Sequence, residues 1–181
     1  MNSRVAVVVA IVGVLLVCAV SAAYLAVRGT PKPDLPCRVV ADGKRYALDR
    51  AQAANAAIIA SAAATVGLPH HAVTIGIATA LQESGLHNLD HGDRDSLGLF
   101  QQRPSQGWGS PAQILDPHFA ATSFFRQLAK VDGWPAMTVS DAAQRVQHSA
   151  RPQAYATWED EARALARATT GELPGALSCN S

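Results

Sequence analysis

Residues 49–85 read DRAQAANAAIIASAAATVGLPHHAVTIGIATALQESG, and this stretch decides the fold of the domain. Asp49 is of a residue type that caps helix N-termini, and the apolar residues after it recur with helical spacing as far as Gly67. Gly67 favours a helix end, and Pro69 can open the next helix. A second helical pattern then runs to Gly85. The stretch therefore predicts two consecutive helices joined by a short turn.

The rest of the domain continues the helical pattern after one interruption. Residues 85–97 have no apolar period and carry Gly, Asn, Asp and Ser, which predicts a long irregular loop with room for short β structure. Gly133 is expected to end the helix that starts near Asp116. Helix starts are expected near Ser110, Asp116, Thr138 and Pro152. The sequence thus predicts an all-α domain over residues 48–181.

The chain has 181 residues and a net charge of +1, which suggests one domain and gives no reason to expect a nucleic-acid partner. Part of its high hydrophobic content lies in residues 5–27, which carry no charge and are long enough to cross a bilayer as a helix. We expect residues 1–28 to be a single-pass membrane anchor. The alternative is a cleaved signal peptide that ends near residues 21–23. Residues 29–47 are expected to be a linker.

The cysteines indicate on which side of the membrane the domain lies. Cys18 falls inside the apolar run, whereas Cys37 and Cys179 lie close to the two ends of the domain. A disulfide between Cys37 and Cys179 would tie these ends together, and the alternative is two unpaired surface thiols. Because a disulfide requires an oxidising compartment, we expect the domain on the extracytoplasmic side of the cell membrane, or secreted if the signal is cleaved.

Glu83 lies in the last turn of the second predicted helix, beside the small residues Gly76, Thr79 and Ala80. A helix C-terminus and partial burial both raise the pKa of a carboxyl group. A raised pKa is what a general acid needs at neutral pH. Glu83 is therefore the candidate catalytic acid, and the alternative is an ordinary helix-end glutamate exposed to water.

Polar and aromatic residues that can contact a sugar follow the loop. Gln101 and Gln102 carry amides that can bond to hydroxyl or acetamido groups, and Gly98 permits a close approach of the backbone. Trp108 lies between two glycines, where its indole can stack on a sugar ring. Core packing is the alternative for Trp108. Together with Glu83, these residues indicate a glycan ligand.

Several segments of the chain resemble the soluble lytic transglycosylase family, which has the lysozyme-like fold. The QES at 82–84 is similar to the family's Glu-Ser at a helix end, and the GLFQ at 98–101 is similar to its Gly-Leu-Met-Gln type of segment. The ILDP at 114–117 resembles the start of the family's next helix. Residues 92–109 look like an actinobacterial subgroup of the family. The resemblance covers about residues 50–170.

The resemblance implies a lysozyme-like peptidoglycan lytic transglycosylase that needs no cofactor and acts on glycan strands. Glu83 would protonate the oxygen between N-acetylmuramic acid and N-acetylglucosamine, through an oxocarbenium-like transition state. Glu83 would then act as base while the sugar's own 6-hydroxyl closes an anhydro product. The substrate-binding residues expected on this basis are Ser84, Gly98, Leu99, Phe100, Gln101, Gln102, Trp108, Gln147 and Tyr155.

The chain departs from the family at residues 145–150. The family has an Ala-Tyr-Asn-Ala-Gly segment there, whereas this chain has RVQHSA. Gln147 could take the place of the Asn, and Tyr155 could supply the missing phenol from the following helix. Because of this departure, a non-catalytic glycan-binding or envelope-assembly domain is the alternative function.

Two further chemistries are alternatives. Asp93 or Asp95 could act as a second carboxylate and activate a water, which would make the protein a muramidase-type hydrolase. The simpler interpretation of both aspartates is a hydrogen-bonded loop scaffold. His87 and His91 suggest a metal site, but they lie in a loop rather than on one helical face, and no Cys joins them. We therefore expect no metal.

Overall fold

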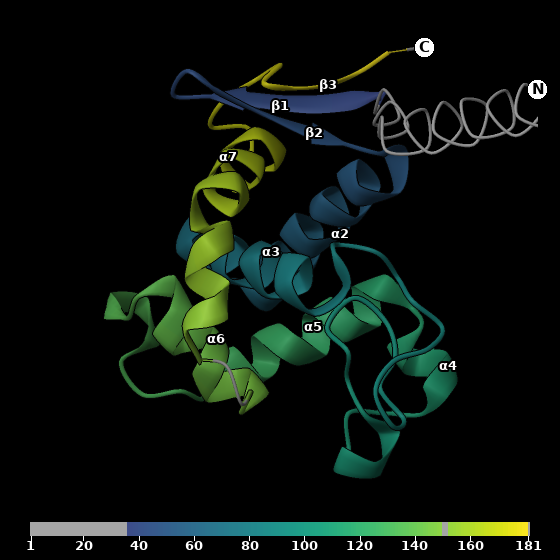
Figure 1. Ribbon diagram of the computed structural model, residues 1–181. Coiled ribbons are helices and arrows are strands. Elements are labelled where there is room, and N and C mark those ends of the chain that lie inside the picture. The colour runs from purple at the N-terminus through teal and green to yellow at the C-terminus, as the bar shows by residue number, and fades with distance from the viewer. Residues whose placement is uncertain (1–35, 150–151, 181) are drawn as a thin grey trace, which may run out of the picture. The chain divides into compact units, whose positions relative to one another are not determined.

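The computed structural model describes residues 36–149 and 152–180, which belong to one compact unit (Figure 1). In these residues the strands are β1 (Cys37–Ala41), β2 (Lys44–Leu48) and β3 (Leu177–Cys179). The α-helices are α2 (Arg50–Val66), α3 (His70–Ser84), α4 (Pro111–Ile114), α5 (Pro117–Leu128), α6 (Val139–Gln147) and α7 (Glu159–Thr169). Short 3₁₀ segments are η1 (Pro104–Gln106), η2 (Trp134–Ala136) and η3 (Pro152–Trp158).

The prediction of an all-α domain is wrong, because a three-stranded antiparallel sheet accompanies the helices. Its strand order is β2-β1-β3, so β1 is the central strand. Residues 37–47, which the sequence analysis assigned to the linker, form most of it. Asp42 and Gly43 join β1 to β2 with positive φ angles of 50° and 73°, as a two-residue hairpin turn requires. An Asp-Gly pair between two runs of alternating apolar residues is typical of a β-hairpin, and the prediction of an all-α domain did not take this signal into account.

The predicted disulfide is confirmed. Cys37 in β1 is bonded to Cys179 in β3, across a sequence separation of 142 residues. The two cysteines are also register partners in the sheet. The bond therefore joins the beginning and the end of the described domain.

Helix α3 lies at the centre of the fold (Figure 1). Every residue from Ala72 to Leu81 is buried, and α2, α5, α6 and α7 all contact this helix. Gly76 lets α5 come close, because an added Cβ would lie 2.7 Å from the ring of Phe125. Gly85 caps the helix in the left-handed conformation, as the sequence predicts. The core therefore fixes the C-terminal end of α3, where Glu83 lies.

The other helix starts follow their capping residues. Asp49, Ser110, Asp116 and Thr138 all cap helices with their side chains, which confirms these starts. Two boundaries differ from the prediction. Helix α5 ends at Leu128, because the backbone then turns with tighter hydrogen bonds that span three residues. The segment at Pro152 is a 3₁₀ segment, and α7 begins only at Glu159.

The predicted anchor, residues 1–28, and the first part of the predicted linker lie outside the described residues. Between residues 36 and 149 and between 152 and 180, no helix is long and apolar enough to cross a bilayer. In the predicted irregular segment, the expected loop is present. The one short β feature next to it is an isolated bridge between Leu97 and Gln102.

Candidate active site

The carboxyl group of Glu83 is held by residues that are distant in sequence. Its Oε1 accepts a hydrogen bond of 2.7 Å from the hydroxyl of Tyr155, and Gln147 hydrogen-bonds to the same side chain. Tyr155 is fully buried and lies in η3, and Gln147 is the last residue of α6. The structure thus brings to Glu83 the two side chains expected to replace the family's missing segment.

Burial raises the pKa of the Glu83 carboxyl above its usual 4.5, while the hydrogen bonds from Tyr155 and Gln147 act in the opposite direction. The position at the C-terminal end of α3 also disfavours negative charge. Burial and the bond to Glu83 raise the pKa of the Tyr155 phenol, so this group stays protonated and donates. Glu83 therefore holds its proton at a higher pH than a glutamate in water does.

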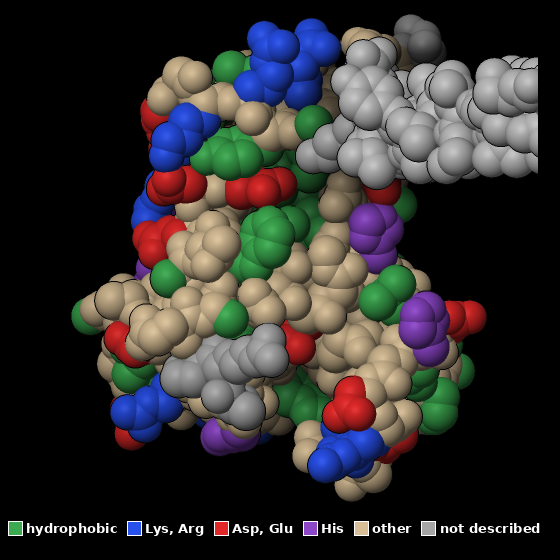
Figure 2. Space-filling model, viewed as in Figure 1, with side chains coloured by type: hydrophobic (Ala, Val, Ile, Leu, Met, Phe, Trp, Pro, Cys, Tyr) green, Lys and Arg blue, Asp and Glu red, His purple; other side chains and the backbone are tan. Residues whose placement is uncertain are grey.

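A pocket of about 430 Å³ opens beside Glu83. Figure 2 shows the surface hollowed between the end of α6 and the irregular segment, residues 85–109, that precedes α4. The lining consists of Glu83, Asp93, Ser96, Gln101, Gln102, Arg103, Gln106, Trp108, Gln147 and Ser149. Such side chains offer both donors and acceptors, which suits a ligand rich in hydroxyl and amide groups.

Three of the expected substrate-binding residues face the core instead of the pocket. Leu99 and Phe100 are 0% and 1% exposed, and the ring of Phe100 stacks on Phe124 with centroids 4.8 Å apart. Gly98 has a φ of 75°, and a Cβ there would lie 2.7 Å from the carbonyl oxygen of Ile114. These residues therefore anchor the irregular segment to the core, and the segment then presents its glutamines to the pocket.

Ser84, another expected substrate-binding residue, ties this segment to α3 instead of lining the pocket. Its hydroxyl donates to the carbonyl oxygen of Leu99 at 2.8 Å. From the other side, the amide of Gln147 donates to the carbonyl oxygen of Phe100 at 2.9 Å. The segment is thus fixed directly to the two helices that carry Glu83 and Gln147.

Gln101 and Gln102 line the pocket as expected, and both also hold its wall. The Nε2 of Gln101 lies 3.3 Å from the carbonyl oxygen of His91 and 3.2 Å from that of Gly98. Gln102 is 2% exposed, and its Nε2 donates to the carbonyl oxygen of Ala120 in α5 at 3.1 Å. These amides therefore position the pocket wall around Glu83.

The two candidate second carboxylates differ in their surroundings. Hydrogen bonds from Ser105 and Arg103 lower the pKa of Asp95, whose Oδ1 lies 2.5 Å from the Nε of Arg103. Asp93 lines the pocket, but its side chain is 93% exposed, and the Nε of Arg94 lies 3.9 Å from its Oδ2. Asp95 is thus part of the loop scaffold. Among the described lining residues, Asp93 is the one carboxylate besides Glu83.

The sequence predicted Trp108 as a site residue, and this side chain is partly buried and lines the pocket. Other residues that line the pocket were not predicted. The pattern in this region has no period, so it does not show which side chains share a face. The one available signal was nearness in sequence to Gln102 and Gln147. The lining residues not singled out from the sequence are Ser96, Arg103, Gln106 and Ser149.

The histidines of the irregular segment are engaged separately. The Nε2 of His87 lies 2.7 Å from Asp49, and the Nδ1 of His91 lies 2.8 Å from Asp90. Across the part of the chain that the structure describes, no three His, Cys, Asp or Glu side chains converge as metal ligands would. The first pair connects the irregular segment to the start of α2, and the second joins two residues adjacent in sequence.

No family model matches this chain, and none of the curated proteins matches it either. The resemblance to soluble lytic transglycosylases therefore stays a prediction from the segments quoted above. The geometry itself provides a carboxyl whose pKa is raised by burial, at the edge of a polar pocket with an aromatic side chain in its wall. Such an arrangement is able to protonate the leaving oxygen of a bound sugar.

Proposed function

We propose that this domain is a peptidoglycan lytic transglycosylase in which Glu83 serves as both acid and base. The observation that carries the proposal is the half-buried carboxyl of Glu83, with its pKa raised by burial, at the edge of a pocket lined by four glutamines. A raised pKa makes a carboxyl better able to hold and donate the proton that a leaving sugar oxygen requires. The glutamine amides and the indole of Trp108 suit N-acetylated sugars.

In the proposed reaction, Glu83 gives its proton to the oxygen between N-acetylmuramic acid and N-acetylglucosamine. The bond from this oxygen to C1 of the muramic acid breaks through an oxocarbenium-like transition state. The Glu83 carboxylate then takes the proton of the muramic acid's own 6-hydroxyl, and the 6-oxygen bonds to C1. The product is an anhydro sugar, Glu83 is protonated again, and no water is consumed.

Tyr155 and Gln147 support the base half of this cycle. Both stabilise the ionised form of Glu83, because each hydrogen-bonds to its carboxylate. Burial favours the protonated form, so the two influences are opposed at one side chain. The carboxyl is therefore able to alternate between acid and base within one turnover.

The proposed location is the extracytoplasmic side of the cell membrane, with residues 1–28 as the anchor. The disulfide between Cys37 and Cys179 supports an oxidising compartment. Peptidoglycan lies on that side of the membrane, so the proposed substrate and the proposed location agree.

The test is mass spectrometry of the soluble products that the full-length chain releases from purified peptidoglycan. We expect anhydro-muropeptides from the wild type and a loss of at least about a hundredfold in the Glu83→Gln variant, because general acid catalysis is removed. Glu161→Gln is a matched control. Burial also raises the pKa of Glu161, which lies in α7 away from the pocket.

Each other outcome points to one alternative. Products with a reducing end would indicate hydrolysis, and Asp93 is the residue to test next because it lines the pocket. Full activity in Glu83→Gln would reject Glu83 as the acid. If neither protein releases products, a glycan-binding or envelope-assembly domain becomes the better explanation.

A further inference from the structure

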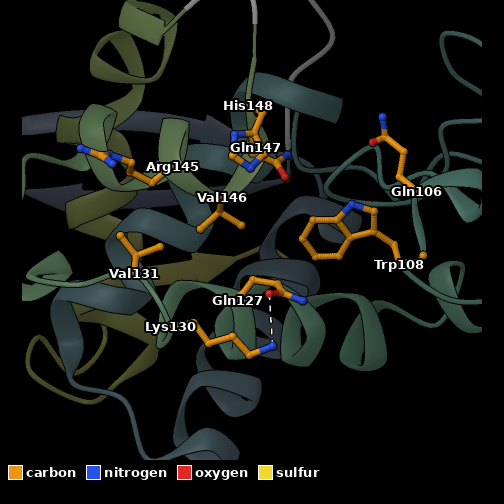
Figure 3. A pocket seen from close by; sticks show the side chains of 10 residues that line it. Gln106, Trp108, Gln127, Lys130, Val131, Arg145, Val146, Gln147 and His148 are labelled. Atoms are coloured by element: carbon orange, nitrogen blue, oxygen red, sulfur yellow. Dashed lines mark hydrogen bonds between the residues drawn. The ribbon is translucent and has the colours of Figure 1, made fainter.

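A second pocket, of about 530 Å³, adjoins the pocket of Glu83. Gln106, Trp108 and Gln147 line both, so the two pockets lie next to each other along one groove. Figure 3 shows Trp108 and Gln106 on one side of the second pocket, with Arg145, Val131 and Lys130 across from them. A ligand bound in the Glu83 pocket could therefore extend past Trp108 into this space.

The far side of the second pocket carries positive charge. Lys130 and Arg145 are exposed side chains, and the described residues that line this pocket include no Asp or Glu. The Nζ of Lys130 reaches a neutral partner, the amide of Gln127 at 3.4 Å. Arg145 forms no ion pair with any residue that the structure describes.

Three other arginines of the domain are closely paired with carboxylates. The guanidinium groups of Arg103, Arg163 and Arg167 all lie within 3.0 Å of a carboxylate oxygen. Lys130 and Arg145 are thus cations without an internal counterion, placed at the wall of a groove. Apolar side chains, Val131 and Val146, line the same wall between them (Figure 3).

We propose that the second pocket binds the stem peptide of peptidoglycan through a carboxylate of that peptide, an inference that rests on the proposed function. Stem peptides branch from muramic acid, the sugar whose bond would be cut at Glu83. They contain alanine methyl groups and free carboxylates. The valines match the methyl groups, and Lys130 and Arg145 match the carboxylate charge.

The test measures binding by the full-length chain in a Glu83→Gln background, so that cleavage does not consume the ligand. Two ligands are compared: soluble glycan strands with their stem peptides, and the same strands after an amidase has removed the peptides. Lys130→Gln with Arg145→Gln is the test variant. Arg126→Gln is the matched control, since Arg126 is an exposed cation of α5 that does not line this pocket.

We expect the test variant to bind peptide-bearing strands about threefold to tenfold more weakly, as exposed charge pairs allow, and to bind stripped strands as before. The difference should shrink in high salt, and Arg126→Gln should change neither affinity. Equal weakening for both ligands, no weakening, or no binding by the background protein would overturn the inference. Failure of the proposed function is seen separately, as absence of products from the protein with Glu83 intact.

Discussion

The sheet end and the site end of the domain are held together in different ways. At the sheet end, β1 is paired along both edges, and the Cys37–Cys179 bond closes the domain. At the site end, residues 85–109 contain little regular structure, and the buried side chains of Leu99 and Phe100 hold them together with single hydrogen bonds such as that from Ser84 to Leu99. Global stability and the geometry around Glu83 therefore rest on different contacts. Changes at each end should therefore have separable effects.

The ion pairs of the sheet end and of the site end also differ in what they connect. Lys and Arg side chains gather over the sheet (Figure 2), and ion pairs from Lys44 to Asp160 and from Arg167 to Asp42 connect the sheet end to α7. At the site end, the pair of Asp95 and Arg103 connects two parts of one irregular segment. Because exposed pairs contribute little to stability, the disulfide should dominate at the sheet end.

The largest expected effect comes from removing the disulfide with Cys37→Ser and Cys179→Ser. The free energy of unfolding should fall by about 4–5 kcal/mol, because a cross-link over so long a loop restricts the unfolded chain strongly. Urea denaturation of the variant and the wild type measures this loss. At low temperature and without urea, where the variant is folded, we expect the rate of the proposed glycan cleavage to be unchanged. A rate that falls together with stability would show that the two ends are coupled.

Gly92→Ala is expected to have a smaller effect, on the rate of the proposed cleavage rather than on stability. An added Cβ would lie 1.9 Å from the Oε1 of Gln101 and 2.8 Å from the carbonyl oxygen of Ser96, so the pocket wall must shift. We expect cleavage to slow by about tenfold to a hundredfold, as displaced catalytic geometry does, with little change in thermal stability. Activity assays and thermal melts on the same samples measure both quantities.

Gly171→Ala is the control for Gly92→Ala. Gly171 has a φ of 83°, and no atom lies within 4 Å of an added Cβ, so the change adds backbone strain without a clash. It should lower stability by about 1 kcal/mol and leave cleavage unchanged. If both variants lose activity to the same extent, the claim that stability and the geometry around Glu83 rest on different contacts is wrong.

The sequence predicted the elements that depend on local interactions and missed those that depend on distant ones. The helices followed from caps and apolar spacing, since residues such as Asp49 and Gly85 act within a few positions of themselves. The sheet was missed because its strands are short and β3 pairs with β1, at the other end of the domain. Only the alternation around Asp42-Gly43 could have revealed it.

Within the candidate site, the sequence indicated the carboxyl group of Glu83 but not the directions in which the neighbouring side chains point. Glu83 was singled out by its place at a helix end together with the resemblance of the QES and GLFQ segments to the transglycosylase family, and the structure places it in the pocket lining. Leu99 and Phe100 were expected at the substrate because a motif names residues without showing their directions, and both are buried in the core. Gln106 was missed because no period marks the faces of an irregular segment.

The smallest expected effect tests the burial of Glu83 itself and needs no enzymatic assay. Burial raises the pKa of this carboxyl in the folded state above 4.5, so the folded protein binds the proton more tightly than the unfolded chain does. The stability from this proton is fully present below pH 4.5 and is lost as the pH rises through the folded-state pKa. Glu83→Gln removes the titration and keeps the shape of the side chain.

Thermal melts of the wild type and Glu83→Gln at a series of pH values should therefore diverge. Their melting temperatures should differ least below pH 4.5, and the variant should gain on the wild type as the pH rises toward neutrality. Tyr155→Phe, which keeps the carboxyl and removes one hydrogen bond to its charged form, should make the decline of stability with pH steeper than in the wild type. A constant difference between wild type and Glu83→Gln at every pH would mean that the folded protein does not perturb Glu83. Burial would then not prepare Glu83 to act as an acid.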